Sequence, residues 1–379
     1  MAQALTFDPV RLPHEAEALR AEVRAFVADT LPDDLLRSSD FGSGHDPEFS
    51  RALGSRGWIG MTWPQQYGGG GRSFFERYVV TEELLAAGAP VEAHWIADRQ
   101  SGPVLLRYGT EEQRAFFLPR IVRGECFFSI GMSEPDSGSD LASVRTSAQR
   151  VQGGWVVNGT KLWTSGAHRN HYMITLIRTE PQGDNRHAGL SQFIIDLKGS
   201  EGLTVRPIAN MAGDEDFNEV VFEDCFVPDE HLLGSAGNGW EQVTSELGYE
   251  RSGPERFLSS FRLLVELVRA VGDAPEPEQA AAIGRLAGHL VTLRKMSISV
   301  AGMLQSNHNP VVEAALVKEL GNNFEKELPE VIRLIAPERS GRLFRRTLED
   351  TLLHAPSFSL RGGTREILRG MIARGLGLR

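Results

Sequence analysis

Helical and strand-like patterns occupy separate stretches of this chain of 379 residues, and their order constrains the fold more than any other feature. Up to Gly124, apolar residues recur at helical spacing, first over residues 15–31, which Pro32 ends. Short segments rich in β-branched and aromatic residues follow, and amphipathic helical patterns return from Gly239 onward. This order differs from the strand–helix alternation of most nucleotide-binding enzymes and predicts an α+β fold.

The same patterns predict three domains and their main elements. We expect an N-terminal α-helical domain over residues 1–124, a middle β domain over 125–236 and a C-terminal α-helical domain over 237–379. In the first domain, Thr110 followed by Gln113 is a capping signal for a helix that reaches Val122. In the last, a helix is expected near 257–268 and a surface loop at 272–279. The expected strands are residues 144–150, 155–159, 172–178, 192–197, 203–207 and 219–222.

Composition excludes several classes of protein. The formal net charge of −10 argues against a nucleic-acid binder, because phosphate contacts need a positive surface. Charged residues interrupt the first thirty positions, and no uncharged apolar run approaches the roughly 18 residues of a membrane span. Cys126 and Cys225 are far apart in sequence, and His168 and His171 have no acidic residue nearby. We therefore expect a cytoplasmic protein with no membrane segment, disulfide framework or metal site.

Two polar segments of the middle region are candidates for ligand binding. The first, IGMSEPDSGSD at 130–140, combines a strand end with a turn at Pro135 and Gly138 and with several hydroxyl groups. Such a loop can offer N–H and hydroxyl groups to a planar heterocycle and a pyrophosphate, although most loops of this composition bind nothing. The second, NGTKLWTSGAH at 158–168, adds an indole and further hydroxyls.

Together these segments resemble the flavin-binding segments of the acyl-CoA dehydrogenase family. Further similarity lies in YGTEEQRAFFLPRIVRGE at 108–125, in the run from 205 to 234, and in RGGTREILRGMIARGLGL at 361–378. Several motifs in the right order are far more specific than one short motif. The resemblance implies FAD as cofactor, conversion of an acyl-CoA thioester to the trans-2-enoyl-CoA, and an electron-transfer flavoprotein as electron acceptor.

The resemblance also implies which residues bind the cofactor. Met132 and Ser133 would lie near the polar edge of the flavin, and Ser139 would also approach the CoA moiety. Trp163 would cover the opposite face, with hydroxyls directed toward the ring. The full expected set is Ile130, Met132, Ser133, Gly138, Ser139, Trp163, Thr164, Ser165, Gly363 and Thr364.

The catalytic base is expected at an uncommon position. Gly362 stands where many family members carry the catalytic glutamate, but its N–H would still donate to the thioester carbonyl. Isovaleryl-CoA and long-chain dehydrogenases instead place the base in a Glu-Arg pair, which Glu250 and Arg251 resemble. Glu250 is therefore the expected base, and Arg251 its electrostatic neighbour or a substrate contact. Ser139 and Tyr249 are further substrate candidates, and Trp95, Ile96 and Arg99 are candidates for the pocket border.

Some features depart from the common family pattern. No Arg-x-x-Phe-Gly segment occurs between 257 and 309, and Arg365 replaces a small hydroxyl residue. The C-terminal region resembles a bacterial subgroup in which some members act on ring-bearing or steroid side-chain thioesters and some pair a complete subunit with an incomplete one. We expect a homo- or hetero-oligomer, a dimer or tetramer. Three functions remain open: a dehydrogenase, a catalytically incomplete partner subunit, and a flavin monooxygenase of the same fold.

Overall fold

The computed structural model describes residues 5–31 and 44–378, except for the side chains of residues 246–250. The described chain divides into two compact units, which we treat separately. The helical unit comprises the described residues of Met1–His45, Arg72–Glu92 and Gly248–Arg379. The sheet unit comprises Asp46–Gly71 and Ala93–Leu247.

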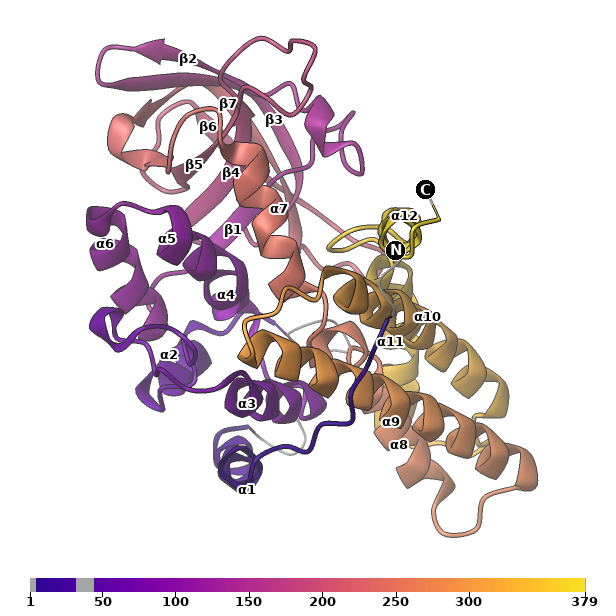
Figure 1. Ribbon diagram of the computed structural model, residues 1–379. Helices are drawn as coiled ribbons and strands as arrows, with labels where there is room; N and C mark the ends of the chain where they lie inside the picture. The colour runs from indigo at the N-terminus through magenta and orange to yellow at the C-terminus, as the bar shows by residue number, and fades with distance from the viewer. Residues whose placement is uncertain (1–4, 32–43, 379) are drawn as a thin grey trace. The chain divides into compact units, whose positions relative to one another are not determined.

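The strands of the sheet unit form one mixed sheet (Figure 1). Its order is β6-β7-β3-β2-β4-β5-β8, and β1 pairs with β4 in parallel. Strands β4 and β5 are buried over almost every residue, as expected for strands covered on both faces. The strands are β1 (Phe128–Gly131), β2 (Ser147–Val151), β3 (Gly154–Ser165), β4 (Tyr172–Arg178), β5 (Leu190–Asp196), β6 (Leu203–Ile208), β7 (Phe217–Pro228) and β8 (Leu232–Leu233).

Some helices of the sheet unit begin at side-chain caps that the sequence supplies. Helix α6 begins after Thr110, whose hydroxyl accepts from the Gln113 N–H while the Gln113 side chain accepts from Thr110, so the predicted capping box is confirmed. Between α4 and α5 the chain makes a π-helical turn over Ala97–Ser101. The helices of this unit are α2 (Pro47–Ser55), α4 (Glu92–Ile96), α5 (Gly102–Tyr108), α6 (Glu111–Val122) and α7 (Gly239–Glu250), the first residue of α4 and the last turn of α7 belonging to the helical unit.

The expected strands are all present, but three of them differ from the expected bounds by three residues or more at one end. The strand expected at 144–150 begins only at Ser147, because residues 141–143 form a 3₁₀ turn and Val144 packs into a cluster with Leu176 and Leu190. The strand expected at 155–159 continues to Ser165. A strand is recognised by the alternation of buried apolar and exposed polar residues, and this stretch does not show it because Lys161 is polar but buried. Likewise β7 runs well beyond the expected 219–222.

The helical unit is built around two long helices, α9 and α10, which lie side by side (Figure 1). Helices α11 and α12 pack on α10, and α3 packs on α1 and α9. Phe257, Leu267, Leu286 and Leu328 are fully buried members of an apolar cluster in this unit. The helices are α1 (His14–Thr30), α3 (Phe74–Ala86), α8 (Phe261–Val271), α9 (Pro277–Gln305), α10 (Val311–Ile335), α11 (Arg342–Phe358) and α12 (Arg365–Gly375).

Two predictions in this unit need correction. The helix expected from 257 begins at Phe261, because Pro254–Arg256 form a separate 3₁₀ turn. The loop expected at 272–279 ends at Glu276, where α9 begins with Pro277 in its first turn. Proline has no N–H to lose at that position, and Glu276 forms a capping box with Gln279.

Along the chain, helical segments therefore precede and follow the strands of the sheet, which confirms the α+β fold class. The domain bounds at 124/125 and 236/237 stay a prediction. No helix among residues 5–31 and 44–378 is long and apolar enough to cross a membrane.

A buried histidine of the sheet unit predicts acid sensitivity. His94 on α4 lies with its Nδ1 2.8 Å from the Ser50 hydroxyl, and burial lowers its pKa to about 4. In the unfolded chain a histidine binds its proton near pH 6.5, so unfolding takes up a proton between these values. Stability should therefore fall by up to roughly 3 kcal/mol as the pH drops from 6.5 to 4.

Denaturant unfolding of wild type and His94→Gln across this pH range measures the effect. In His94→Gln the free energy of unfolding should depend much less on pH, whereas His308→Gln, at an exposed position, should show the same pH dependence as wild type. Equal slopes in wild type and His94→Gln would contradict the assignment.

Candidate functional site

The segment after β1 folds back on itself in a tight turn. Glu134 and Ser137 exchange two main-chain hydrogen bonds of 2.6 and 3.1 Å around Pro135 and Asp136. The Ser137 hydroxyl donates to the Asp140 carbonyl at 2.8 Å. The predicted turn is thus present, and it leaves Gly138 and Ser139 exposed to solvent.

A buried ion pair joins this turn to β3. The Lys161 side chain is 0% exposed, and its ammonium donates to Glu134 at 2.8 Å and to the Met132 carbonyl at 3.2 Å. The Glu134 carboxylate also accepts from the N–H groups of Arg145 at 2.6 Å and Thr146 at 3.0 Å. Since the Leu162 N–H donates to the Ser133 carbonyl at 2.8 Å, the two candidate flavin segments are held together.

The electrostatics of the pair favour the charged form of Glu134. Burial alone raises the pKa of this carboxyl, but Lys161 and the N–H donors outweigh it and hold the pKa below 4.5. Both quoted motifs contain one member of the pair, yet sequence reasoning assigned neither a role. The signal available was a lysine inside a segment that otherwise reads as a buried strand.

Trp163 has an unusual conformation. Its φ is 61°, in the left-handed region that a bulky side chain rarely adopts, and the register of β3 against β7 shifts between Lys161 and Thr164. The indole is 56% exposed and contacts Phe217 edge-on at 6.1 Å between ring centroids. Backbone strain that exposes a large apolar ring is typical of a functional position.

The neighbouring hydroxyl also lacks a hydrogen-bond partner in the part of the chain that the structure describes. Thr164 is buried, and its Oγ1 has no hydrogen-bond partner among the described residues. A buried hydroxyl without a partner is costly unless a ligand supplies one. An exposed indole beside such a hydroxyl fits a planar, hydrogen-bonding group, so Trp163 and Thr164 suit the isoalloxazine of FAD.

Side chains from neighbouring strands hold this end of β3. The Ser165 carbonyl accepts from the Ser129 hydroxyl at 2.7 Å, and the Thr164 carbonyl accepts from Asn218 at 2.9 Å. His168 Nδ1 lies 2.8 Å from the Asn218 side-chain oxygen. His171 accepts from the Phe127 N–H at 3.1 Å. Both histidines thus have structural contacts, and sequence reasoning missed the role of Asn218.

The Thr164 hydroxyl gives a direct test of cofactor binding. Replacing it with valine in Thr164→Val removes the unpartnered group while keeping the shape of the side chain. Flavin affinity should fall about tenfold, the value of one hydrogen bond, whereas the apoprotein should be as stable as wild type or slightly more stable. Isothermal titration of apoprotein with FAD and thermal unfolding of apoprotein measure the two effects. Thr160→Val on the same strand is the control, and equal affinities in wild type and Thr164→Val would remove Thr164 from the site.

In the helical unit Gly362 lies in a turn that leads into α12. Gly362 and Gly363 have φ values of 63° and 98°, which only glycine adopts without strain, and Thr364 is the N-cap. The Lys318 ammonium donates to the Gly363 carbonyl at 2.9 Å. Buried Arg251 donates to the Met371 sulfur at 2.8 Å.

Arg365, which the sequence left unexplained, has a structural role. It and Arg369 both bind the Glu319 carboxylate of α10, at 3.2 and 2.8 Å. These ion pairs tie α12 to α10, so Arg365 stabilises the helix that follows the Gly362 turn.

Other predicted residues fall on or near these elements. Glu250 ends α7 and Arg251 follows it, but the side chains of Tyr249 and Glu250 lie outside the described residues, so their roles stay predictions. In the sheet unit, the guanidinium of Arg99 lies over the Trp95 ring at 4.6 Å, within the turn that follows Ile96. Whether this group borders a pocket also stays a prediction.

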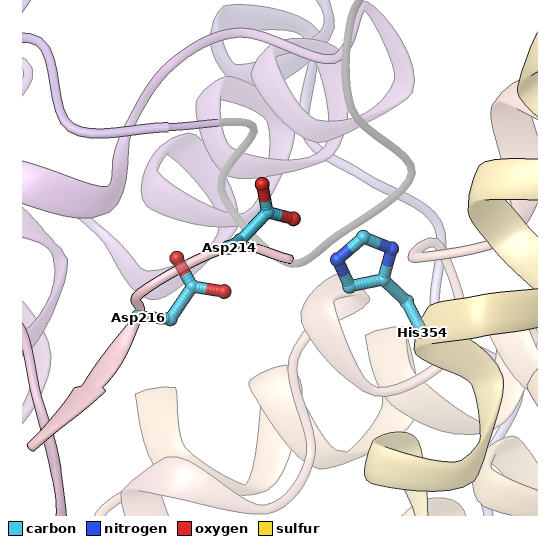
Figure 2. A group of neighbouring side chains, drawn as sticks. All are labelled: Asp214, Asp216 and His354. Atoms are coloured by element: carbon cyan, nitrogen blue, oxygen red, sulfur yellow. The ribbon is translucent and has the colours of Figure 1, made fainter. Parts of the chain in front are cut away.

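Figure 2 shows three further titratable side chains. Asp214 and Asp216 precede β7, where Asn210 donates to the Asp216 carboxylate at 3.3 Å. His354 lies on α11 with its Nδ1 2.9 Å from the Asp350 carbonyl, one helical turn earlier. The aspartates belong to the sheet unit and the histidine to the helical unit, so we assign no common site to them.

Comparison with known proteins places this arrangement in a family. Residues 13–125 match the N-terminal domain of acyl-CoA dehydrogenases, and residues 129–225 match the middle domain. Acyl-CoA dehydrogenase FadE26 of Mycobacterium tuberculosis is 31% identical, over 96% of this chain and 97% of that protein. IpdE1 of Mycolicibacterium smegmatis is 32% identical, over 96% and 98%. The chain also matches FadE34 of M. tuberculosis at 32% identity, but it spans only 49% of that protein.

Solved structures agree with the sequence matches. A Tcur3481-Tcur3483 steroid ACAD superposes with a TM-score of 0.86 at 30% identity, covering 97% of this chain and 98% of that one. The ChsE4-ChsE5 complex of M. tuberculosis gives 0.84 at 30% identity, covering 98% and 100%. Two domain matches, relatives above 30% identity over nearly the full length, and the same fold lead to one conclusion: this chain belongs to the acyl-CoA dehydrogenase family.

Proposed function

We propose that this protein dehydrogenates an acyl-CoA thioester to the trans-2-enoyl-CoA with FAD, and passes the electrons to an electron-transfer flavoprotein. The observation that carries the proposal is the exposed, strained Trp163 beside the unpartnered Thr164 hydroxyl, in a chain of this family. When bound, FAD supplies the acceptor for the hydride that leaves the β-carbon. The segment from Ile130 to Ser139, together with Trp163, Thr164 and Ser165, would hold it.

The helical unit would supply the acid–base chemistry. An α-proton of a thioester is weakly acidic, so its removal needs a carboxylate base and donors for the oxygen that gains charge. Glu250 would take the proton, and the Gly362 N–H would donate to the thioester oxygen. Arg251 would add positive charge, whereas Gly363 and Thr364 precede a helix whose first N–H groups suit an anion. Ser139 and Tyr249 would contact the substrate.

Anaerobic reduction of the bound flavin tests the proposal. Purified protein should be yellow, and its visible absorbance should bleach when the right acyl-CoA is added without oxygen. The panel should contain straight, branched and cyclic acyl-CoA thioesters and a steroid side-chain thioester, since one solved neighbour is a steroid ACAD. Protein that stays colourless after reconstitution with FAD would overturn the proposal, and rapid turnover that requires oxygen would favour a monooxygenase.

A second candidate is a partner subunit that completes a heteromeric dehydrogenase without its own chemistry. It is favoured by the glycine at 362 and by the ChsE4-ChsE5 complex among the neighbours. Co-expression with a related subunit from the source organism separates the two. If the chain alone binds flavin and the flavin bleaches with an acyl-CoA, the protein is a complete enzyme. If flavin is bound only when the partner is co-expressed, the protein is an incomplete subunit.

A further inference from the structure

Lys318 is a charged side chain in the interior of the helical unit. It lies on α10 and is 0% exposed. Burying an ammonium costs free energy unless polar groups receive its charge, so the hydrogen-bond partners of this side chain matter to the fold. Its ammonium donates to the Gly363 carbonyl at 2.9 Å. The contact joins the middle of a long helix to a turn that contains no regular secondary structure.

The acceptor of this hydrogen bond lies at a sensitive place. Gly362 and Gly363 are both in the left-handed region, and two adjacent glycines have more backbone freedom than other residues, so contacts from outside the turn restrict its conformation. Arg251 approaches the same turn, since its Nη2 lies 3.3 Å from where a β-carbon on Gly363 would stand. Two buried cations therefore converge on the turn that presents the Gly362 amide.

A cation at a carbonyl also changes the amide to which that carbonyl belongs. The Gly363 carbonyl and the Thr364 N–H are parts of one peptide group, and a charged donor on the oxygen makes the N–H a stronger donor. The positive charge also favours any negative charge that develops near the turn, because water does not screen a buried charge well.

We propose that Lys318 is a positioning residue for the dehydrogenation: by holding the Gly363 carbonyl it keeps the Gly362 N–H in place to stabilise the negatively charged thioester oxygen. The inference rests on the proposed function. It predicts that Lys318 affects ionisation of the bound thioester more than binding of the thioester.

The test uses the FAD-loaded protein and a 3-thia analogue of the thioester that reduces wild-type flavin fastest. The sulfur acidifies the α-proton and replaces the β-carbon, so reaction stops after the base removes the proton. In Lys318→Met the ratio of ionised to un-ionised bound analogue, read from long-wavelength absorbance, should fall about tenfold, while the Kd changes less than about threefold. Lys318→Gln keeps a hydrogen-bond donor without the charge, so its ratio of ionised to un-ionised analogue should lie between those of wild type and Lys318→Met. Lys326→Met, at an exposed position of α10, should match wild type.

A second measurement does not depend on the reaction. Amide hydrogen exchange in peptides covering 359–366 of the ligand-free holoenzyme should be faster in Lys318→Met than in wild type and Lys326→Met. If Lys318→Met ionises the bound analogue to the same extent as wild type, or exchanges its amides at the same rate, Lys318 does not have this role. The proposed function still stands in either case. No flavin reduction by any thioester overturns the proposed function itself, and with it the effect on ionisation.

Discussion

Replacing Glu250 with glutamine is expected to slow flavin reduction by an acyl-CoA about 10³-fold. An amide of the same size cannot accept the α-proton, and general-base catalysis contributes between about 10² and 10⁴ in rate. Flavin content and thioester affinity should stay close to wild type, because the substitution preserves shape and leaves the sheet unit unchanged. Anaerobic stopped-flow measurement of the flavin absorbance gives the rate, and titration with the thioester gives the affinity.

The matched control for this variant is Glu241→Gln, an exposed carboxylate at the other end of α7. It should reduce flavin at the wild-type rate. If Glu250→Gln is as fast as wild type, the base lies elsewhere in the chain. If it loses its flavin as well as its activity, Glu250 has a structural role instead of the catalytic one.

Of the substitutions considered, removal of the Lys161 charge should lower the free energy of unfolding the most. In Lys161→Met the Glu134 carboxylate stays buried without its counter-ion, and breaking a buried pair by one partner costs about 3–5 kcal/mol. The turn that contains Met132 and Ser133 would also lose its side-chain attachment to β3 and keep only the main-chain bond from Leu162, so flavin binding should weaken together with stability. Chemical denaturation of apoprotein at pH 7 measures the first effect and FAD titration measures the second.

A double variant separates charge from packing. In Lys161→Met with Glu134→Gln no uncompensated charge remains, and the Gln carbonyl can still accept from a main-chain N–H, so most of the lost stability should return. Lys198→Met, at an exposed position of the sheet unit, is the control for removing a positive charge. A loss below about 1 kcal/mol in Lys161→Met would mean that the pair has little energetic role.

Local patterns predicted several of the elements. Periodicity and caps located α1 and α6 to within a residue or two, because helix signals are local. The predicted strand at 155–159 was shorter than β3, because its second half depends on a long-range contact. Lys161 is polar in sequence but buried by a partner 27 positions away, and no local pattern reports such a contact.

The candidate site likewise has features that the sequence predicted and features that only the structure shows. Motif order identified the family and the turn at 130–140, since these depend on residue identity alone. The strained conformation of Trp163 and the unpartnered hydroxyl of Thr164 appear only in three dimensions, because they depend on the register between β3 and β7. The contact from Lys318 to Gly363 spans 45 positions and has no motif.

The sequence by itself determined the order of helical and strand regions, the family and the residue types present at each candidate position. Those properties follow from residue identity and short-range periodicity. Only the tertiary structure decided which partners the charged side chains meet, namely Lys161 with Glu134, Lys318 with the Gly363 carbonyl, and Arg365 with Glu319. A buried charge must find its partner wherever the chain brings one, so these pairings depend on how distant segments pack.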